Sequence, residues 1–564
     1  MNDVKTPSVI AGNPSASRKW LPPLRPLLLA LLSGVMVGCC FPPCDFPWLT
    51  WLPWVALSPL CWALWMLPRA GDVGLWARHA FLLGWLSGTA SFLISLHWIT
   101  TVTIPGWVAL CLIIGLYHGL WALFGGLVLR PLGEGNDPAT AWLGSGRNLL
   151  VALLAAAAWV AVEWLRGTLF SGFGWNSLGV SLRNSIPLIQ ITSVTGTPGL
   201  TFLAALGGAT LAITAKRLSR EISTGRPRPH FDFFAAIFLV VLAFSYGVQK
   251  ITAPPVPSVK LKVAGLQGNI PVYDYWDKKC EGPIMERYVG MTRTALAGDP
   301  DLVIWPEAAV PRPLLLDEII FGQVKELAAK TRADFLIGSV HYEQEPRGDY
   351  NSAILLTDHA AAAQLYHKVH LVPFGEYVPF RHTFPPLGWL VGNRVPYDFD
   401  PGKGPSLLTL SQHGPTHDKV KLGPLLCFED TLGDQTRCAA AMGAQLLVTL
   451  TNDGWFEHSV ATRQHLANSQ MRSVENGIPL LRVADTGITC AVDRLGRVKE
   501  ILRSPKGNTF IQGILQTEIA VPAHPAPTFY ARHGDLFAHG CLAITAAMAA
   551  AGILTLRRSK DRAS

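Results

Sequence analysis

Long apolar stretches separated by short polar loops fill the first 250 residues of the chain and return once near its C-terminus. Residues 79–129 contain no Asp, Glu, Lys or Arg, and this stretch is more than twice the roughly 20 residues that one membrane-crossing helix needs. Pro105 and Gly106 within it predict the turn between two such helices. The pattern predicts about eight membrane spans, at residues 24–40, 48–68, 79–99, 107–129, 148–167, 192–215, 232–249 and 537–556.

Between residues 258 and 520 the pattern changes to short apolar runs that alternate with amphipathic segments. This alternation predicts a layered α/β domain in which helices cover sheet faces. Strands are expected at residues 259–267, 302–305, 335–340, 353–357, 424–428, 446–451, 480–484 and 488–492. Helices are expected at residues 280–297, 316–332, 432–443 and 460–476. Proline-rich segments at 252–257 and 522–527 separate this domain from a membrane bundle of about seven spans (1–250) and a closing span (537–556).

Composition and charge support a membrane protein. Of the 564 residues 49% are hydrophobic and 15% charged, and 15 of the 19 tryptophans precede residue 176, as expected of side chains that favour the membrane–water boundary. The net charge of +8 could suggest nucleic acid, but the basic residues lie in short loops between spans without interleaved aromatic residues. We therefore expect no nucleic-acid partner.

The basic residues gather in alternate loops. There are four before or at the start of the first span, two each in 69–78 and 130–147, five in 216–231 and four after residue 556, whereas 41–47 and 100–106 have none. The positive-inside rule then places both termini in the cytoplasm and residues 250–536 on the opposite side. Segment 168–191 is the weak point, and we interpret it as interfacial or re-entrant. Glu163 and Arg166 just before it indicate a polar function or mutual pairing, with interfacial snorkelling as the alternative.

The ten cysteines include no C-x-x-C pair and no zinc-like spacing. A disulfide among Cys280, Cys438 and Cys490 stays open. Cys427 ends the apolar run 422–426 and precedes a helical segment. Such a strand-to-helix corner exposes a side chain and points backbone N–H groups at a bound group, although most free cysteines are buried packing residues.

Two further chemical groups follow apolar runs upstream. Glu307 comes after 301–306, where partial burial would favour a general base, and Lys368 could lower the pKa of a thiol and stabilise an oxyanion. Taken alone, each could be an ordinary surface residue. The chain has no G-x-S-x-G, H-E-x-x-H or Walker motif. His367 and His370 lack a nearby third ligand, so we expect no metal and no cofactor.

Glu307, Lys368 and Cys427, about 60 residues apart, resemble the Glu-Lys-Cys triad of the nitrilase, or carbon–nitrogen hydrolase, superfamily. Longer motifs are more specific: they resemble the apolipoprotein N-acyltransferase family over nearly the whole chain. These motifs are HLVPFGEYVP at 370–379, TNDGWF at 451–456, EWLRG at 163–167 and GFGW at 172–175.

The resemblance implies a four-layer α-β-β-α sandwich for residues 258–520, on the periplasmic side of a multi-pass protein of the bacterial inner membrane. It also implies a reaction in which a fatty acyl chain moves from a phospholipid, typically phosphatidylethanolamine, to the α-amine of a diacylglyceryl-cysteine apolipoprotein. A thioester on Cys427 and ping-pong kinetics are expected, with a monomer surrounded by membrane lipids.

The roles of individual residues follow from the same resemblance. Glu307 would act as the general base, and Lys368 and the N–H of Phe428 would stabilise the oxyanion. Glu376 is expected to orient Lys368, and Glu429 to support the nucleophile; plain ion pairing is the alternative for both. Substrate contacts are expected from Trp276, Trp455 and Tyr377, with core packing as the alternative for the tryptophans.

Two other functions compete with acyl transfer. A membrane-tethered nitrilase or amidase acting on small soluble amides would keep the triad but would need only one anchor. A transporter with an extracytoplasmic binding domain would need charged residues deep in its bundle, of which the sequence shows few.

Overall fold

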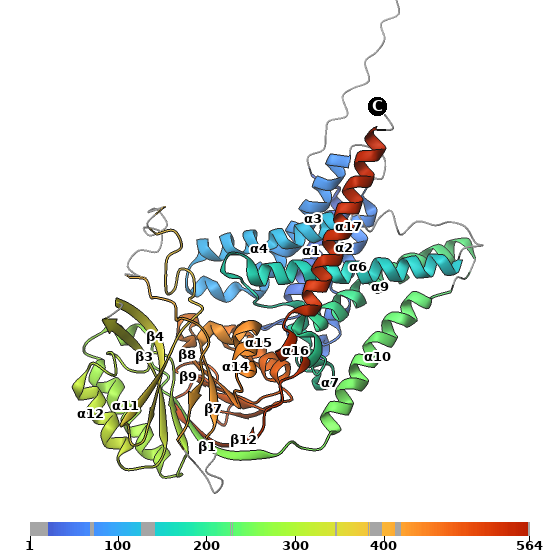
Figure 1. The fold of residues 1–564 in the computed structure, drawn as a ribbon. Coiled ribbons are helices and arrows are strands. Elements are labelled where there is room, and N and C mark those ends of the chain that lie inside the picture. The colour runs from blue at the N-terminus through green and yellow to red at the C-terminus, as the bar shows by residue number, and fades with distance from the viewer. Residues whose placement is uncertain are drawn as a thin grey trace, which may run out of the picture.

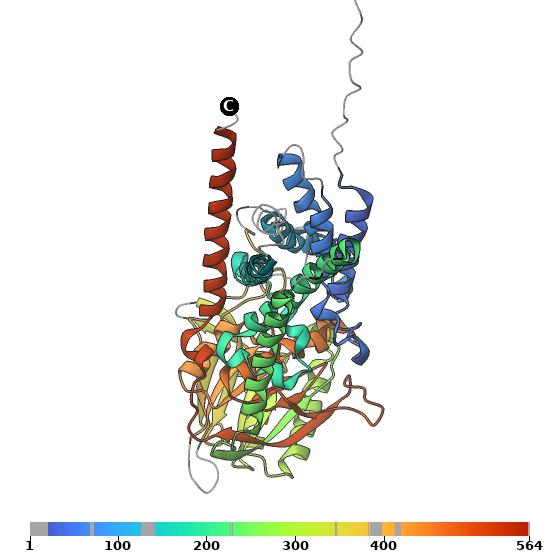
Figure 2. The same cartoon turned by 90° about the vertical axis from the view of Figure 1, so that its right-hand side faces the viewer.

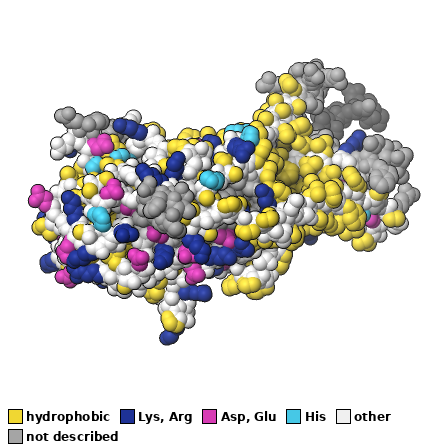
Figure 3. All heavy atoms as spheres, turned by 60° about the horizontal axis from the view of Figure 1, so that its bottom comes forward, with side chains coloured by type: hydrophobic (Ala, Val, Ile, Leu, Met, Phe, Trp, Pro, Cys, Tyr) yellow, Lys and Arg dark blue, Asp and Glu magenta, His cyan; other side chains and the backbone are white. Residues whose placement is uncertain are grey.

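The computed structural model describes residues 21–67, 73–125, 141–225, 227, 229–344, 347–381, 383, 397–411 and 419–561. A bundle of helices is joined to a layered α/β domain, and both are visible in Figure 1. In the view of Figure 3, charged side chains gather over one end of the molecule, and apolar side chains cover much of the remainder. This separation is typical of a protein that lies partly in lipid.

Six helical stretches among the described residues are long and apolar enough to cross a membrane, which is fewer than the eight predicted. They are Pro47–Met66, Ile104–Phe124 (α4), Gly144–Ser171 (mostly α6, Ala141–Thr168), Thr197–Thr224 (α9), Phe231–Thr252 (α10) and Leu536–Leu554 (in α17, Leu536–Asp561). Most of the surface of α10 and α17 is exposed, and both lie at the edge of the bundle (Figures 1 and 2).

Two of the eight predicted spans, 24–40 and 79–99, are helical but are not among these six. Helix α1 (Leu24–Gly38) has 15 residues, which at about 1.5 Å per residue fall short of a hydrocarbon core of about 30 Å. Helix α3 (Val73–Ser95) is long enough, but it carries several serines and a histidine and is not among the six. The predicted span 192–215 is among the six but begins later, because Gly196, at φ +65°, ends α8 (Thr192–Thr195) before α9 begins.

Small residues let three of these helices approach closely. A Cβ atom at Gly34 of α1 would overlap the carbonyl oxygen of Ser87 in α3, and one at Gly84 of α3 would overlap that of His118 in α4. Without apolar driving force between helices in lipid, such close backbone contact is a main source of association.

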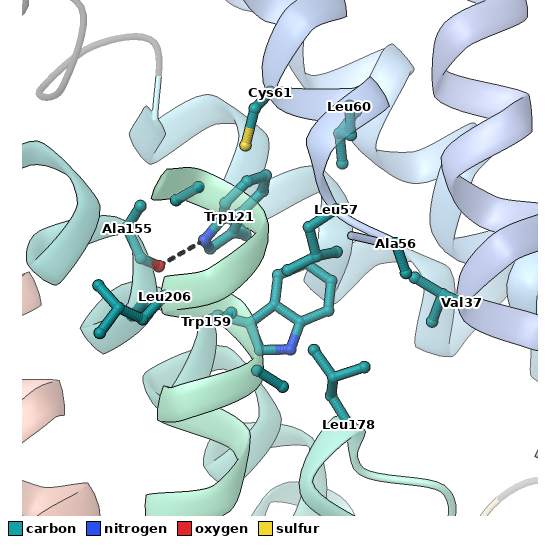
Figure 4. Close-up of a cluster of buried hydrophobic side chains, with 14 of the residues drawn as sticks. Val37, Ala56, Leu57, Leu60, Cys61, Trp121, Ala155, Trp159, Leu178 and Leu206 are labelled. Carbon is teal, nitrogen blue, oxygen red and sulfur yellow. Dashed lines mark hydrogen bonds between the residues drawn. The ribbon is translucent and has the colours of Figure 1, made fainter. Parts of the chain in front are cut away.

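Deeper in the bundle two tryptophans form the centre of an apolar cluster (Figure 4). Trp121 of α4 and Trp159 of α6 lie edge to face with ring centroids 5.1 Å apart, and Trp121 Nε1 donates to the carbonyl of Ala155 at 2.9 Å. Around them lie Leu57, directly before α2 (Ser58–Met66), Leu60 of α2 and Leu206 of α9. The cluster therefore joins four helical segments.

The α/β domain contains two six-stranded sheets. The first has the order β12-β1-β2-β3-β4-β5, and the second the order β11-β10-β9-β8-β7-β6. The first-sheet strands are β1 (Ser258–Gln267), β2 (Leu302–Trp305), β3 (Asp334–Gln344), β4 (Arg347–Thr357), β5 (Ala362–His367) and β12 (Gly513–Pro522). The second-sheet strands are β6 (Leu408–Thr409), β7 (Lys421–Leu426), β8 (Leu446–Thr451), β9 (Leu480–Ala484), β10 (Cys490–Val492) and β11 (Val498–Ile501).

The expected four-layer sandwich is confirmed. Leu302 and Ile304 of the first sheet meet Leu446 and Val448 of the second in one buried core. Helices α11 (Glu281–Leu296) and α12 (Glu318–Ala328) cover the outer face of the first sheet. Helices α14 (Gly433–Ala441) and α15 (Ala461–Asn476) cover the second and lie between it and the bundle (Figure 1).

Segment 168–191 folds into short helical pieces, η6 (Leu169–Ser171), η7 (Leu178–Leu182) and α7 (Ile186–Ile189). Arg166 Nη1 donates to the carbonyls of Phe173 and Trp175, at 2.8 and 2.7 Å, while Glu163 accepts from the N–H of Leu178 at 2.9 Å. The two charged residues therefore hold this segment rather than pair mainly with each other.

All ten cysteines are free thiols, so the structure contains no disulfide among Cys280, Cys438 and Cys490. Several basic residues behind the predicted topology lie outside the described residues: Lys5, Arg18, Lys19, Arg69, Arg130, Arg226, Arg228 and Arg562.

Candidate active site

Cys427 lies directly after β7, at the first position of the short helix η10 (Cys427–Thr431). Its φ is +49°, an unusual backbone conformation for a residue other than glycine and one often found at functional sites. The side chain is half-buried. The predicted strand-to-helix corner is therefore present, although the strand ends one residue before the cysteine.

Glu307 lies two residues after the buried strand β2, and its side chain is nearly inaccessible to solvent. Its Oε1 accepts from Asn351 Nδ2 at 2.8 Å, and its Oε2 accepts from the N–H of Asn452 at 3.0 Å. These two donors come from β4 and from the end of β8, so both sheets fix the orientation of the carboxylate.

Lys368 follows β5 and is fully buried. Its Nζ donates to Glu376 Oε1 at 2.9 Å and to Glu307 Oε1 at 3.4 Å. Burial opposes the charge of Lys368, but Glu376, Glu307 and Cys427 outweigh it, so the pKa of this ammonium is raised. Lys368 therefore stays protonated near neutral pH.

The charges of Glu307 and Lys368 both act on the Cys427 thiol, which places the three side chains in one site. Burial first, and then the Glu307 carboxylate, raise the pKa of the Cys427 thiol well above its usual value. Lys368 lowers this pKa, as expected, but does not compensate. The sequence-based expectation that Lys368 lowers the pKa of the thiol agrees in direction, and burial, which sequence alone did not show, outweighs it.

Glu429 is buried and joins the segments next to Lys368 and Cys427. Its Oε1 accepts from the N–H groups of Val369 and His370, at 2.7 and 3.1 Å, and its Oε2 accepts from the N–H of Leu426 at 2.8 Å. Burial raises the pKa of Glu429 and these hydrogen bonds lower it, with burial dominant. The carboxylate thus links the backbone that follows Lys368 to the backbone that precedes Cys427.

Phe428 lies between aromatic rings from both parts of the chain. Its ring is parallel to that of Trp175 in segment 168–191 and stacks on His370, with centroid distances of 6.2 and 5.8 Å. The turn that carries Cys427 and Phe428 therefore contacts the helical half of the chain.

The expected substrate-contacting aromatics do not form part of the core. Trp276, in η8 (Val272–Trp276), and Trp455, in η11 (Asp453–Phe456), are both exposed and lie 5.4 Å apart between ring centroids. Tyr377 is half-buried, one residue after Glu376, and its carbonyl accepts from the N–H of Phe374. Core packing is thus excluded for the two tryptophans.

Sequence reasoning missed Asn351 and a buried charged cluster behind Cys427. Asn351 Nδ2 donates to both Glu307 and Glu376, at 2.8 Å each. The cluster consists of Asp430, Asp453, His465 and Arg482, all of them buried. Arg482 pairs with Asp430 at 2.7 Å and with Asp453 at 2.8 Å. Asp453 lies in the TNDGWF motif, but the other three residues are scattered along the chain and meet only in the folded structure.

One group among the described residues has side chains that could hold a metal ion: His341, Glu343 and His367. His367 Nε2 lies 3.3 Å from Glu343 Oε1, and its ring stacks on those of His341 and Tyr350. His341 and Glu343 lie near the C-terminal end of β3, and His367 is the last residue of β5. The group does not include His370, the second histidine considered from the sequence.

Comparisons with known proteins agree with this description. Residues 33–210 match the family model of the apolipoprotein N-acyltransferase N-terminal domain, and residues 262–521 match that of carbon-nitrogen hydrolase. An apolipoprotein N-acyltransferase of Geobacter metallireducens is 33% identical over 94% of this chain and 95% of its own length. One of Shewanella oneidensis is 29% identical over 85% and 90%. An amidase of the nitrilase superfamily from Nesterenkonia aligns in structure with 51% of this chain and 99% of its own, at 19% identity and a TM-score of 0.35.

The fold and the site define a multi-pass membrane protein that carries an enzyme domain of the carbon–nitrogen hydrolase superfamily. The identity with relatives extends through the helical half as well as through this domain. The chain belongs to the apolipoprotein N-acyltransferase family.

Proposed function

We propose that this protein transfers a fatty acyl chain from a phospholipid to the N-terminal amine of a diacylglyceryl-cysteine apolipoprotein. The observation that carries the proposal is identity over nearly the full length of a relative of that name, in both the helical half and the catalytic half. The position of Cys427 beside the bundle supports it, because both substrates are anchored in lipid.

In the first half-reaction Glu307 takes the proton of Cys427 as the sulfur attacks the ester carbonyl carbon of the phospholipid. Lys368 and the N–H of Phe428 stabilise the tetrahedral oxyanion. The carbon–oxygen bond then breaks, Glu307 returns the proton to the departing lysophospholipid, and a thioester remains on Cys427. Because the pKa of the thiol is raised, deprotonation and attack belong to the same step.

In the second half-reaction the lipoprotein amine attacks the thioester carbonyl and loses a proton to Glu307. The carbon–sulfur bond breaks, an amide forms, and the thiol regains its proton. One site serves two substrates in turn, so ping-pong kinetics follow. Glu376 fixes Lys368, Glu429 fixes the backbone on either side, and Trp276, Trp455 and Tyr377 contact lipid or gate the site.

The proposed location is the bacterial inner membrane, with both termini in the cytoplasm and residues 258–520 in the periplasm, as the alternating basic loops favour. A monomer contains all the groups that this mechanism uses. Holding the thiol at the bilayer surface raises the effective concentration of both lipidated substrates.

A labelled phospholipid without acceptor provides the test. Label should collect on Cys427, be released by hydroxylamine at neutral pH, and move to an added diacylglyceryl peptide. Cys427→Ala should remain unlabelled, whereas Cys438→Ala, which removes a half-buried thiol of the same domain, should label normally. Release of free fatty acid with no transfer to the peptide, or hydrolysis of small amides alone, would favour the tethered amidase instead.

A further inference from the structure

Helix α15 lies between the second sheet and the bundle, and nearly all of its residues are buried even though most are polar. Buried polar side chains are costly unless each is hydrogen-bonded. Two consecutive residues near its start, Gln464 and His465, have partners on opposite sides.

Among the described residues, all hydrogen-bond partners of the Gln464 side chain belong to the membrane half. Its Oε1 accepts from Trp175 Nε1, Trp98 Nε1 and Asn176 Nδ2, at 2.8, 3.0 and 3.0 Å. Its Nε2 donates to the carbonyls of Pro42 and Ser95, at 2.7 and 2.8 Å. These partners come from the chain after α1, from the end of α3 and the turn that follows it, and from segment 168–191.

Consecutive helical residues are about 100° apart around the axis, so His465 faces a different direction from Gln464. It points toward the catalytic centre. Its Nε2 lies 3.2 Å from the carbonyl oxygen of Cys427 and 2.8 Å from Asp430 Oδ1, and its Nδ1 lies 2.9 Å from Asp453 Oδ1. Burial and Arg482 lower the pKa of His465, but the two carboxylates outweigh them and raise it to about 9. The charged ring can then donate from both nitrogens.

We propose that Gln464 and His465 are positioning residues that hold the Cys427 corner in a fixed place relative to the membrane helices. An amide suits the first position because it supplies two donors and an acceptor; a carboxylate would lack the donors that Pro42 and Ser95 need. An apolar residue would leave five partners unsatisfied. The fixed place matters because a thiol that must reach a lipid ester loses rate steeply when it is misplaced by about 1 Å.

The same contact continues through aromatic rings. The ring centroids of Trp175 and Trp98 lie 5.5 Å apart. Trp175 stacks on Phe428, and Trp98 packs edge to face on Phe456 with 4.6 Å between the ring centroids. Because both indoles also donate to Gln464, a shift of either ring changes hydrogen bonding and stacking together. The two tryptophans therefore connect the bundle to the segments that carry Phe428 and Phe456.

The test compares Gln464→Met with Gln470→Met in the full-length protein. Gln470 is on the same helix, is buried, and donates to Gly496 and Arg183 carbonyls at 2.7 and 3.3 Å, away from Cys427. Gln464→Met should slow formation of the labelled acyl-enzyme on the order of 10²-fold, while Gln470→Met changes it little. Alkylation of Cys427 by iodoacetamide, a small soluble reagent, should stay close to the wild-type rate in both.

Equal acylation rates in the two variants, or a parallel loss of alkylation in Gln464→Met, would overturn the proposal. If Gln464→Met does not fold, Trp98→Phe removes one of the five hydrogen bonds and keeps an aromatic side chain; it should give a smaller, severalfold loss of acylation. The lipid arm of this test rests on the proposed function. Hydrogen–deuterium exchange of residues 423–431 does not, and it should increase in Gln464→Met only. A wild-type protein that forms no acyl-enzyme would refute the proposed function, whereas unchanged exchange would refute the positioning role.

Discussion

Trp175 lies parallel to Phe428, with 6.2 Å between the ring centroids and 5° between the ring planes. One ring belongs to the membrane half and the other directly follows the candidate nucleophile. Replacing Trp175 with Ala removes this stacking and the hydrogen bond to Gln464. We expect acyl-enzyme formation to fall about 10- to 100-fold, measured with labelled phospholipid. Trp164→Ala is the control, because Trp164, on α6, also donates to a residue distant in sequence, Asp535 just before α17, at 2.9 Å. Similar losses in both variants would show a general effect on assembly.

The raised pKa of Cys427 predicts the pH dependence of its alkylation. Only the thiolate reacts with iodoacetamide, and burial and Glu307 keep the thiol protonated near pH 7. The alkylation rate should therefore rise about tenfold per pH unit from pH 7 to 9 without reaching a plateau. A plateau below pH 8 would contradict the assigned direction of the shift.

Glu307→Gln should have opposite effects on two reactions of the same sulfur. Removing the carboxylate lowers the pKa of Cys427, so alkylation at pH 8 should become faster and its pH profile should move to lower pH. Acyl-enzyme formation should fall on the order of 10²- to 10⁴-fold, because the general base is lost. Lys368→Met is the counterpart: its alkylation profile should move to higher pH. Slower alkylation in Glu307→Gln would count against a direct effect of its charge on the thiol.

Asn351 predicts a loss of both activity and stability. Its amide nitrogen donates to Glu307 and to Glu376, so Asn351→Leu leaves a buried and a half-buried carboxylate without that donor. A cost of about 1–3 kcal/mol in the free energy of unfolding is expected, together with slower acylation. Thermal unfolding and acyl-enzyme formation measure the two effects. Asn508→Leu, at an exposed turn, should change neither.

Close packing of α3 on α4 predicts that a single methyl group is harmful. Gly84→Ala would press a Cβ atom against the carbonyl of His118, with an expected cost of about 1–3 kcal/mol or more. Gly144→Ala in α6 meets nothing within 4 Å and should be neutral or slightly stabilising. The unfolding midpoints of the two variants in detergent distinguish them; equal midpoints would mean that the helices can separate at little cost.

The buried strands were predictable from sequence to the residue. β2, β8 and β9 are inaccessible along their whole length, so they appear as uninterrupted apolar runs with clear ends. The four strands that were missed, β5, β6, β11 and β12, are partly exposed and mix charged or polar residues with apolar ones. Their pairing depends on neighbours far away in the chain, as when β12 pairs with β1.

The site was predictable only where chemistry and local context coincide. Glu307, Lys368 and Cys427 each follow a strand, and reactive residue types at such places are recognisable. Asn351, Gln464 and His465 have ordinary residue types whose importance comes from partners more than 20 residues away. The raised pKa of Cys427 was also out of reach, because it depends on burial that only the assembled fold creates.

The burial of α15 on all sides limits how this enzyme can be divided or recombined. A cut between residues 250 and 258 would leave one fragment with a polar, amide-rich face made to match indoles and carbonyls that are no longer there. A chimera that combines the helical half of one relative with the catalytic half of another would face the same mismatch, unless α15 and segment 168–191 come from the same parent. Helix α15 and segment 168–191 therefore have to be exchanged together when parts of two relatives are combined.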